Sequence, residues 1–190
     1  MPPKAGLNTA SVVAAAAGLI DREGLEALTL SRLAALLKVQ PPSLYNHIAG
    51  LPGLRRELAL LSTRELGARL TRAALGQSGP PALHGLAQAY RAFIREHPGL
   101  YAAGLRGADP LAPDRELGQA QELVVSVVLA VVASFGLSGA EGLHAVRILR
   151  SAVHGFATLE TAGGFGLPLD CDESFRRLLD TLTRGFENRG

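Results

Sequence analysis

The stretch Gln40-Pro41-Pro42-Ser43-Leu44-Tyr45-Asn46-His47-Ile48 decides how the first third of this chain folds. Proline is tolerated in the first helical turn because its missing N–H would have no helical partner there. The pattern therefore predicts a very short helix over residues 41–47. Leu44 and Ile48 lie four residues apart and give this helix one apolar inner face, while the polar side chains around them face outward or sideways.

Helix signals also precede this stretch. Residues 9–23 carry an apolar stripe that ends before Gly24, and Thr29 or Ser31 begins a second helix that runs to Leu37. Two short helices joined by a tight turn, with a third helix behind them, form a helix-turn-helix pattern. Because the second helix is short and polar outside, it can enter a major groove about 12 Å wide. The pattern predicts a DNA-binding head over residues 1–50.

The distribution of charge supports this hypothesis. The chain carries 19 Lys and Arg against 17 Asp and Glu, so the formal net charge is only +2. No acid occurs between residues 27 and 56, where Arg32, Lys38, Arg55 and Arg56 all lie. A window without acids also arises by chance. Together with the helix-turn-helix pattern, however, it favours duplex DNA as a partner.

Composition predicts an all-α fold of about nine helices. Of the 190 residues, 47% are hydrophobic, and Ala and Leu outnumber the β-branched and aromatic residues typical of strands. The single Cys171 excludes an intramolecular disulfide framework and any zinc cluster built on cysteines. Beyond the head, helices are predicted at about residues 52–75, 81–97, 99–105, 114–136, 138–161 and 171–187, with a loop at 108–113. We take residues 51–190 as one helical domain.

The first sixty residues resemble the DNA-binding domain of the tetracycline-repressor (TetR) family. The resemblance rests on residues 7–13, 21–29, Leu33-Ala34 and 42–47, and above all on the spacing of Ser43-Leu44-Tyr45 and His47. It implies a homodimeric transcriptional regulator, usually a repressor that a small ligand releases from DNA. By motif match, Thr29 holds a phosphate, Gln40, Pro41 and Ser43 face base edges, and Tyr45 and His47 clamp phosphates. Ser31, Arg32, Lys38 and Asn46 complete the predicted DNA-binding set.

Two positions depart from the family pattern. The family usually has Gly in the turn where this chain has Lys38, and a lysine in the left-handed conformation costs roughly 1 kcal/mol unless the turn differs here. We consider a contact from Lys38 to a phosphate as compensation for this conformational cost. The family usually has Lys where this chain has Leu51. Either Arg55 or Arg56 substitutes for that phosphate contact, or non-specific affinity is weaker.

The region from residue 100 to 186 resembles the C-terminal regulatory domain of TetR-family members named for a Trp-His-Gly motif. This chain has His154-Gly155 but no Trp, so the residue that provides one wall of the family's ligand pocket is absent from the sequence. The resemblance implies binding of a small effector and dimerisation. The candidates to line an apolar cavity are Tyr90, Phe93, Tyr101, Phe135, His154 and Phe156. For each aromatic residue the alternative is plain core packing, and for His154 it is a bond to a backbone carbonyl.

Two apolar stripes near the end of the chain predict a four-helix dimer interface. The stripe residues are Leu143, Val146 and Val153 on one helix and Phe175, Leu178, Leu179 and Leu182 on the next. A dimer of this kind places its recognition helices about 34 Å apart, one turn of DNA, and so predicts a palindromic operator. A ligand would shift the long helix at residues 52–75 and spoil this spacing.

The uncharged run at residues 123–140 is the main reason to consider a function other than DNA binding. We expect a helix that is buried on all sides inside a soluble helical domain, because the run is at the short limit for crossing a bilayer and contains Ser126 and Ser134. The alternative function is a helical interaction protein or membrane-associated protein without a role at DNA. Acids at residues 21 and 23 in the first helix argue against a signal peptide, so we expect a cytoplasmic protein without membrane contact.

The sequence offers no sign of catalysis. It contains no G-x-S-x-G elbow, no phosphate-binding Gly-rich loop and no carboxylate pair in an apolar setting. No pair of His, Cys, Asp or Glu has the spacing of an interior metal site. We therefore expect neither an enzyme nor a metal or cofactor. Asp170 and Asp172 are interpreted as capping residues of the last helix.

Overall fold

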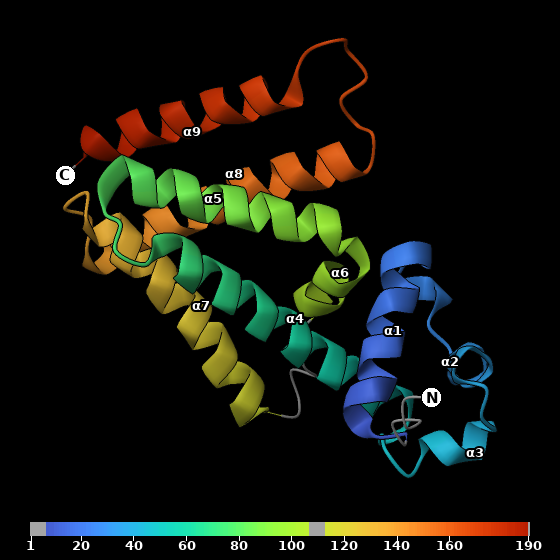
Figure 1. Ribbon diagram of the computed structural model, residues 1–190. Helices are drawn as coiled ribbons and strands as arrows, with labels where there is room; N and C mark the ends of the chain where they lie inside the picture. The colour runs from blue at the N-terminus through green and yellow to red at the C-terminus, as the bar shows by residue number, and fades with distance from the viewer. Residues whose placement is uncertain (1–6, 107–112, 190) are drawn as a thin grey trace. The chain divides into compact units, whose positions relative to one another are not determined.

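The computed structural model describes residues 7–106 and 113–189, and within them every regular element is a helix (Figure 1). The described residues form nine α-helices and one short 3-10 helix, which confirms the all-α prediction. The helices are α1 (Thr9–Glu23), η1 (Leu25–Ala27), α2 (Leu30–Leu37), α3 (Pro41–Leu44), α4 (Gly50–Ala74), α5 (Gly79–Glu96), α6 (Pro98–Arg106), α7 (Arg115–Ala133), α8 (Gly139–Thr161) and α9 (Cys171–Glu187). Apart from Pro113, the predicted loop at 108–113 lies outside the described residues.

The chain divides into two compact units. Among the described residues, those up to Ser62 pack with those from His97 to Leu117, and the rest form the second unit. Helix α4 belongs to both, since it runs without a break from Gly50 to Ala74. Helix α6 therefore packs with the head, although it lies in the middle of the sequence. The functional boundary that we placed at residue 50 stays a prediction.

Local sequence signals explain where the first helices begin and end. The Asn8 carboxamide accepts a hydrogen bond from the Ser11 N–H at 2.8 Å, and the Ser11 hydroxyl in turn accepts one from the Asn8 N–H, which makes a capping box. Gly24 ends α1 with a φ of 83°. The Thr29 hydroxyl caps α2 by accepting from the Arg32 N–H at 3.2 Å. The helix at 9–23 is thus confirmed to the residue.

In the first unit, the beginning of α6 is docked on the end of α1. The Asp21 carboxylate accepts a hydrogen bond from the Leu100 N–H at 2.8 Å and lies 2.9 Å from His97 Nδ1. A Cβ atom added to Gly99 would stand 2.0 Å from the Ile20 carbonyl oxygen, so only glycine permits this approach. Asp21 thus supplies an acceptor to the N–H groups that every helix start leaves unpaired.

In the second unit, α5, α8 and α9 pack on one another (Figure 1). Their core is apolar and includes the fully buried Leu83, Leu86, Phe93 and Phe175. The outer face of α9 carries Arg176 and Arg177, which pair with Glu173 of the same helix. The two arginines, Arg176 first, lower the pKa of Glu173 to about 2. A helix with one apolar and one charged face buries only the former.

Helix α7 corrects one expectation. We predicted a helix buried on all sides over the apolar run at 123–140, but only 28% of its most apolar window is buried, with Leu123 and Val125 exposed. α7 is the one helix among the described residues that is long and apolar enough to cross a membrane by length and composition. The run also ends as a helix at Ala133 rather than at residue 136. A uniformly apolar sequence does not reveal which faces the fold will cover.

Candidate nucleic-acid interface

The turn between α2 and α3 is built around Lys38. This residue ends α2 with φ 56° and ψ 41°, the left-handed conformation in which L residues are disfavoured. Its N–H donates to the Ala35 carbonyl at 3.2 Å, and the Val39 N–H donates to the Ala34 carbonyl at 3.0 Å. The turn thus has the geometry that glycine usually provides, and the difference from the family pattern is in the residue and not in the turn.

The segment after the turn begins at Gln40 and is shorter as a regular helix than predicted. α3 ends at Leu44 rather than His47, and the chain continues as a hydrogen-bonded turn in which the His47 and Ile48 N–H groups both donate to the Leu44 carbonyl, at 2.9 and 3.0 Å. Leu44 is fully buried and Ile48 is 7% exposed, which confirms the predicted inner face. This anchoring directs the rest of the segment toward solvent.

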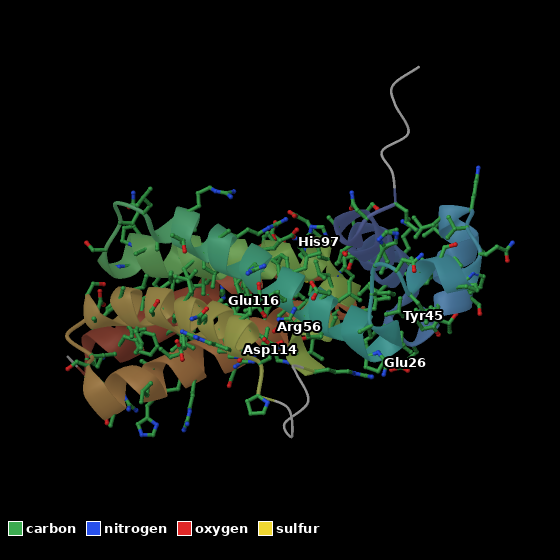
Figure 2. All side chains as sticks on the ribbon, turned by 90° about the horizontal axis from the view of Figure 1, so that it is seen from below. Glu26, Tyr45, Arg56, His97, Asp114 and Glu116 are labelled. Carbon is green, nitrogen blue, oxygen red and sulfur yellow. The ribbon has the colours of Figure 1, made fainter. Side chains whose placement is uncertain are left out.

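The outward side chains of this segment are polar or aromatic apart from two prolines at its start. Tyr45 is 62% exposed (Figure 2), and it is an unusually exposed aromatic side chain for a folded domain. The predicted set as a whole lies on the surface of the head: Thr29, Ser31, Arg32, Lys38, Gln40, Pro41, Tyr45 and Asn46 are exposed, and Ser43 and His47 are half-buried. Their contact with DNA stays a prediction.

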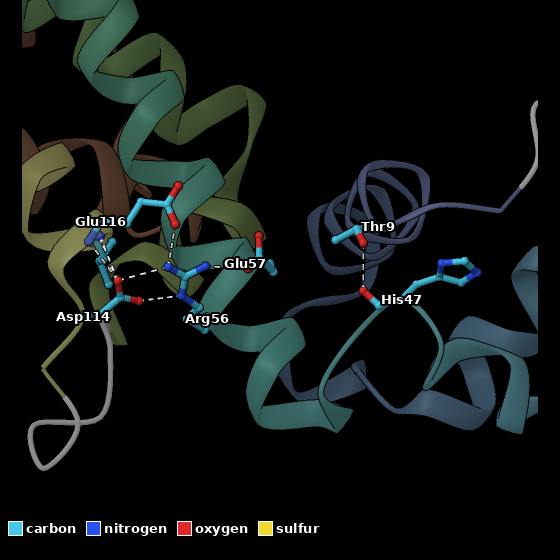
Figure 3. Close-up of polar contacts among 7 residues, drawn as sticks. Thr9, His47, Arg56, Glu57, Asp114 and Glu116 are labelled. Carbon is cyan, nitrogen blue, oxygen red and sulfur yellow. Dashed lines mark hydrogen bonds and ion pairs between the residues drawn. The ribbon is translucent and has the colours of Figure 1, made fainter.

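Sequence reasoning missed the part that α1 plays here. The Thr9 hydroxyl donates a hydrogen bond to the His47 carbonyl oxygen at 2.9 Å (Figure 3). This bond ties the first residue of α1 to the end of the segment at 40–48, across 38 positions in the sequence. Only the position of Thr9 next to the Asn8 cap signalled its place at a helix start, and nothing in the sequence indicated its partner.

Two of the four cations in the acid-free window have partners elsewhere. Arg32 pairs with Glu23, and both side chains are largely exposed. Arg56 binds Asp114 through Nε at 2.5 Å and Nη2 at 3.0 Å, and it also reaches Glu116 at 2.7 Å and Glu57 at 2.6 Å (Figure 3). These ion pairs favour Arg55 over Arg56 as the substitute for a phosphate contact at Leu51, and that substitution stays a prediction.

The Arg56 cluster instead holds the start of α7 to α4. Hydrogen bonding to Arg56 is the main cause that lowers the Asp114 pKa to about 2, and the same bond raises the Arg56 pKa above its usual value. Asp114 also accepts from the Glu116 and Leu117 N–H groups, both at 3.1 Å, and so caps α7. Of the arginines considered for the missing phosphate contact, this leaves Arg55, which is exposed.

The predicted effector-binding residues are distributed over both units. Tyr101 lies with the head, and Tyr90, Phe93, Phe135, His154 and Phe156 lie in the second unit. Tyr90, Phe93, Tyr101 and Phe135 are buried, whereas His154 and Phe156 are half-buried. The Phe135 ring packs edge-on against Phe186 with centroids 6.0 Å apart, and Phe156 packs on Phe165 and Phe175.

The predicted dimer interface needs a correction. Val153, Phe175 and Leu179 are fully buried inside the subunit, so they present nothing to a partner. Of the predicted set, Leu143 is exposed and Val146, Leu178 and Leu182 are half-buried. On α8 the exposed residues Ile148 and Leu159 and the half-buried Gly155 form a separate stripe with spacings of seven and four residues. A Cβ on Gly155 would meet no atom of the subunit.

Comparison with known proteins gives consistent matches along the chain. A family model described as "Tetracyclin repressor-like, C-terminal domain" matches residues 83–182. The chain is 35% identical over 188 residues to the uncharacterized HTH-type transcriptional regulator Rv0681 of Mycobacterium tuberculosis, covering 97% of this chain and 84% of that protein. It is 33% identical over 186 residues to the uncharacterized HTH-type transcriptional regulator YobS of Bacillus subtilis, covering 97% and 95%.

Solved structures share the fold. A protein of unknown function from Rhodococcus sp. RHA1 superposes with a TM-score of 0.82 at 23% identity, covering 97% of this chain and 98% of that one. A TetR variant from Acinetobacter baumannii AYE in complex with minocycline superposes with a TM-score of 0.70 at 24% identity, covering 96% and 97%.

Proposed function

Because this chain belongs to the tetracycline-repressor family of helix-turn-helix transcriptional regulators, we propose that it represses transcription as a homodimer bound to a palindromic operator. The observation that carries the proposal is the segment at 40–48, which buries Leu44 and Ile48 and exposes Tyr45. A short element anchored on its inner side and polar on its outer side can enter a major groove. We infer that residues 1–50 are the DNA-binding part.

The predicted residues take different roles in this proposal. Gln40, Pro41 and Ser43 face base edges, whereas Tyr45 and His47 contact phosphates. Thr29, Ser31, Arg32, Lys38 and Asn46 supply the remaining contacts, and the Thr29 hydroxyl keeps its proton for a phosphate because it uses only its oxygen in capping α2. Phosphate contacts position the protein, and base contacts select the sequence.

A footprint on the DNA upstream of the protein's own coding sequence tests this assignment. Tyr45→Ala is expected to lower the affinity for the footprinted site about tenfold, equally for all sequences, since a lost phosphate contact carries no sequence information. Changes at Gln40 or Ser43 are expected to alter the preferred base instead. Leu167→Ala, an exposed apolar change in the second unit, is the control. Operator affinity that survives Tyr45→Ala at physiological salt contradicts the assignment.

The dimer is proposed to form through α8 and α9. Leu143, Val146, Leu178 and Leu182 remain accessible from the predicted set, and the stripe of Ile148, Gly155 and Leu159 extends it. Ile148→Asp is expected to shift the protein to monomer in light scattering, because a carboxylate would be buried without a partner. Leu167→Asp in the exposed connection between α8 and α9 is the matched control. A dimeric Ile148→Asp variant contradicts this interface.

We propose that a small, largely apolar effector binds the second unit, near Tyr90, Phe93, Phe135, His154 and Phe156, and releases the protein from DNA. Tyr101 packs with the head and is the weakest member of the predicted set. The support is that the Acinetobacter TetR structure of the same fold holds minocycline. Helix α4 continues from the head into the second unit, so a shift of α4 would move each head. Such an effector must bind the released state more tightly than the DNA-bound state.

Membrane association through α7 is the competing function, because α7 is apolar and largely exposed. Sedimentation with vesicles of mixed neutral and anionic lipid separates the two hypotheses. A regulator in the cytoplasm, without an enzymatic or cofactor role, is expected to stay in the supernatant. Co-sedimentation that detergent abolishes, together with absence of a footprint, would support the competing function.

A further inference from the structure

Arg91 in α5 is a buried cation to which the proposed function gives no role. It is 3% exposed, and it is the one buried side chain that carries a charge among the described residues. Its Nε and Nη2 atoms donate to the two oxygens of Glu160 near the end of α8, at 2.8 and 2.5 Å. Its Nη1 atom lies 2.8 Å from Asp172 in the first turn of α9. One guanidinium therefore joins three helices.

Aromatic rings fix the plane of this guanidinium. Its central carbon lies 4.7 Å from the Phe175 ring centroid and 5.4 Å from that of Phe156. Arginine stacked on aromatic rings and bound to both oxygens of a carboxylate has little freedom of orientation. Hydrogen bonding to Glu160 is the largest cause that raises the Arg91 pKa above its usual value, so the guanidinium is charged at neutral pH.

The stability of the fold does not by itself require such a buried ion pair. Apolar residues of similar volume often replace buried ion pairs without loss of stability. The arginine fixes the positions of α8 and α9 relative to α5. The connection between α8 and α9 is exposed at every residue from 161 to 170, and its Phe165 ring packs on Phe156 of α8. Beside apolar packing and this ring contact, the Arg91 contacts hold the α9 N-terminus on α5.

The other end of α5 leads directly to the head. α5 ends at Glu96 and α6 begins at Pro98, with only His97 between them. α6 is held on α1 by the bonds of Asp21 to Leu100 and His97 and by the close approach of Gly99 to Ile20. The chain thus passes from α5 to α6 through one residue, and within the first unit α6 is fixed to α1.

We propose that Arg91 is a positioning residue that fixes α8 and α9 to α5 and thereby sets the spacing at which the two heads of the dimer meet DNA. This inference rests on the proposed function, since it assumes a dimer formed through α8 and α9 and bound to two half-sites. In this proposal the residue acts through the helices that it joins and not through a contact with DNA. Its effect is on how strictly the dimer selects the distance between half-sites.

The test compares Arg91→Met combined with Glu160→Leu, which replaces the ion pair by apolar side chains, with the wild type. Affinities are measured for the footprinted operator and for fragments whose half-sites are moved closer or apart by one base pair. Arg91→Lys keeps the charge but cannot bind both Glu160 oxygens, and it serves as the conservative variant. Arg177→Met removes an exposed arginine that pairs within α9 and is the control.

The double variant is expected to remain a dimer with a wild-type thermal midpoint, to bind the operator about tenfold more weakly, and to bind the shifted fragments nearly as well as the operator. Arg91→Lys should fall in between. An unchanged spacing preference in the double variant overturns the proposal. If the double variant does not fold, the spacing preference of Arg91→Lys decides the test. A loss of operator affinity that only follows the loss of thermal stability also overturns the proposal. A wild type without a footprint refutes the proposed function instead.

Discussion

Replacing Lys38 separates the strain of the turn from the charge of the side chain. Lys38→Gly and Lys38→Ala both remove the ammonium group, but only glycine relieves the left-handed backbone at φ 56°. That conformation costs an L residue roughly 1 to 2 kcal/mol, and glycine loses roughly 0.5 to 1 kcal/mol through its larger freedom in the unfolded chain. Lys38→Gly should therefore exceed Lys38→Ala in free energy of unfolding by about 0.5 to 1 kcal/mol.

Urea unfolding of the two variants measures this difference, and thermal unfolding should show a gap of about 1 to 4 °C for a chain of this size. A glycine variant no more stable than the alanine variant would refute the strain argument. DNA affinity over a series of salt concentrations tests the charge. If Lys38 contacts a phosphate, both variants lose about 0.9 from the slope of log affinity against log salt for each contact removed. An unchanged slope in both would show that the lysine does not reach DNA.

Three further predictions concern stability. Gly99→Ala should lower the thermal midpoint, because its Cβ would lie 2.0 Å from the Ile20 carbonyl oxygen, whereas Gly118→Ala, where a Cβ meets no atom, should not lower it. Asp114 has a folded pKa of about 2, below its ordinary 3.8, so its contribution to stability is present above pH 3.8 and is lost as pH falls through 2. Asp114→Asn should accordingly reduce the stability at neutral pH and flatten the acid side of a pH series of thermal midpoints. Thr29→Ala should cost about 1 kcal/mol in urea unfolding by removing the cap of α2, and an unchanged value would show that the hydroxyl does not cap.

Local signals in the sequence were sufficient to predict α1, α2 and the start of α3. Asn8, Gly24 and Thr29 mark helix ends through their own backbone preferences, and Pro41 fixes the first turn of α3, so no distant residue had to be known. The exposure of α7 could not be predicted in the same way. A helix that is apolar on all faces carries no periodicity, and the degree to which it is covered depends on the rest of the fold.

The dimer stripe fails for a related reason. An apolar stripe such as Phe175 and Leu179 indicates that a helix has one face to bury, but not whether its own subunit or a partner covers that face. Here α5 and α8 cover it. A partner must use what remains, which on α8 is a stripe interrupted by Gly155, where a second helix could approach closely. Sequence periodicity identifies the face that a helix buries in its own subunit. It does not identify a further face that a partner would cover.

The charges of the head show most clearly what a sequence window omits. Counting residues 27–56 gives four cations and no acid, but Glu23 lies just outside the window, and Asp114 is 58 residues from Arg56 in the sequence. In the proposed complex Arg32 must exchange Glu23 for a phosphate, whereas Lys38 and Arg55 are exposed. We therefore expect affinity to depend more on neutral hydrogen-bonding groups such as Ser43, and on two heads binding at once. This dependence makes the spacing between the heads, and with it the Arg91 contacts, matter more than the net charge suggests.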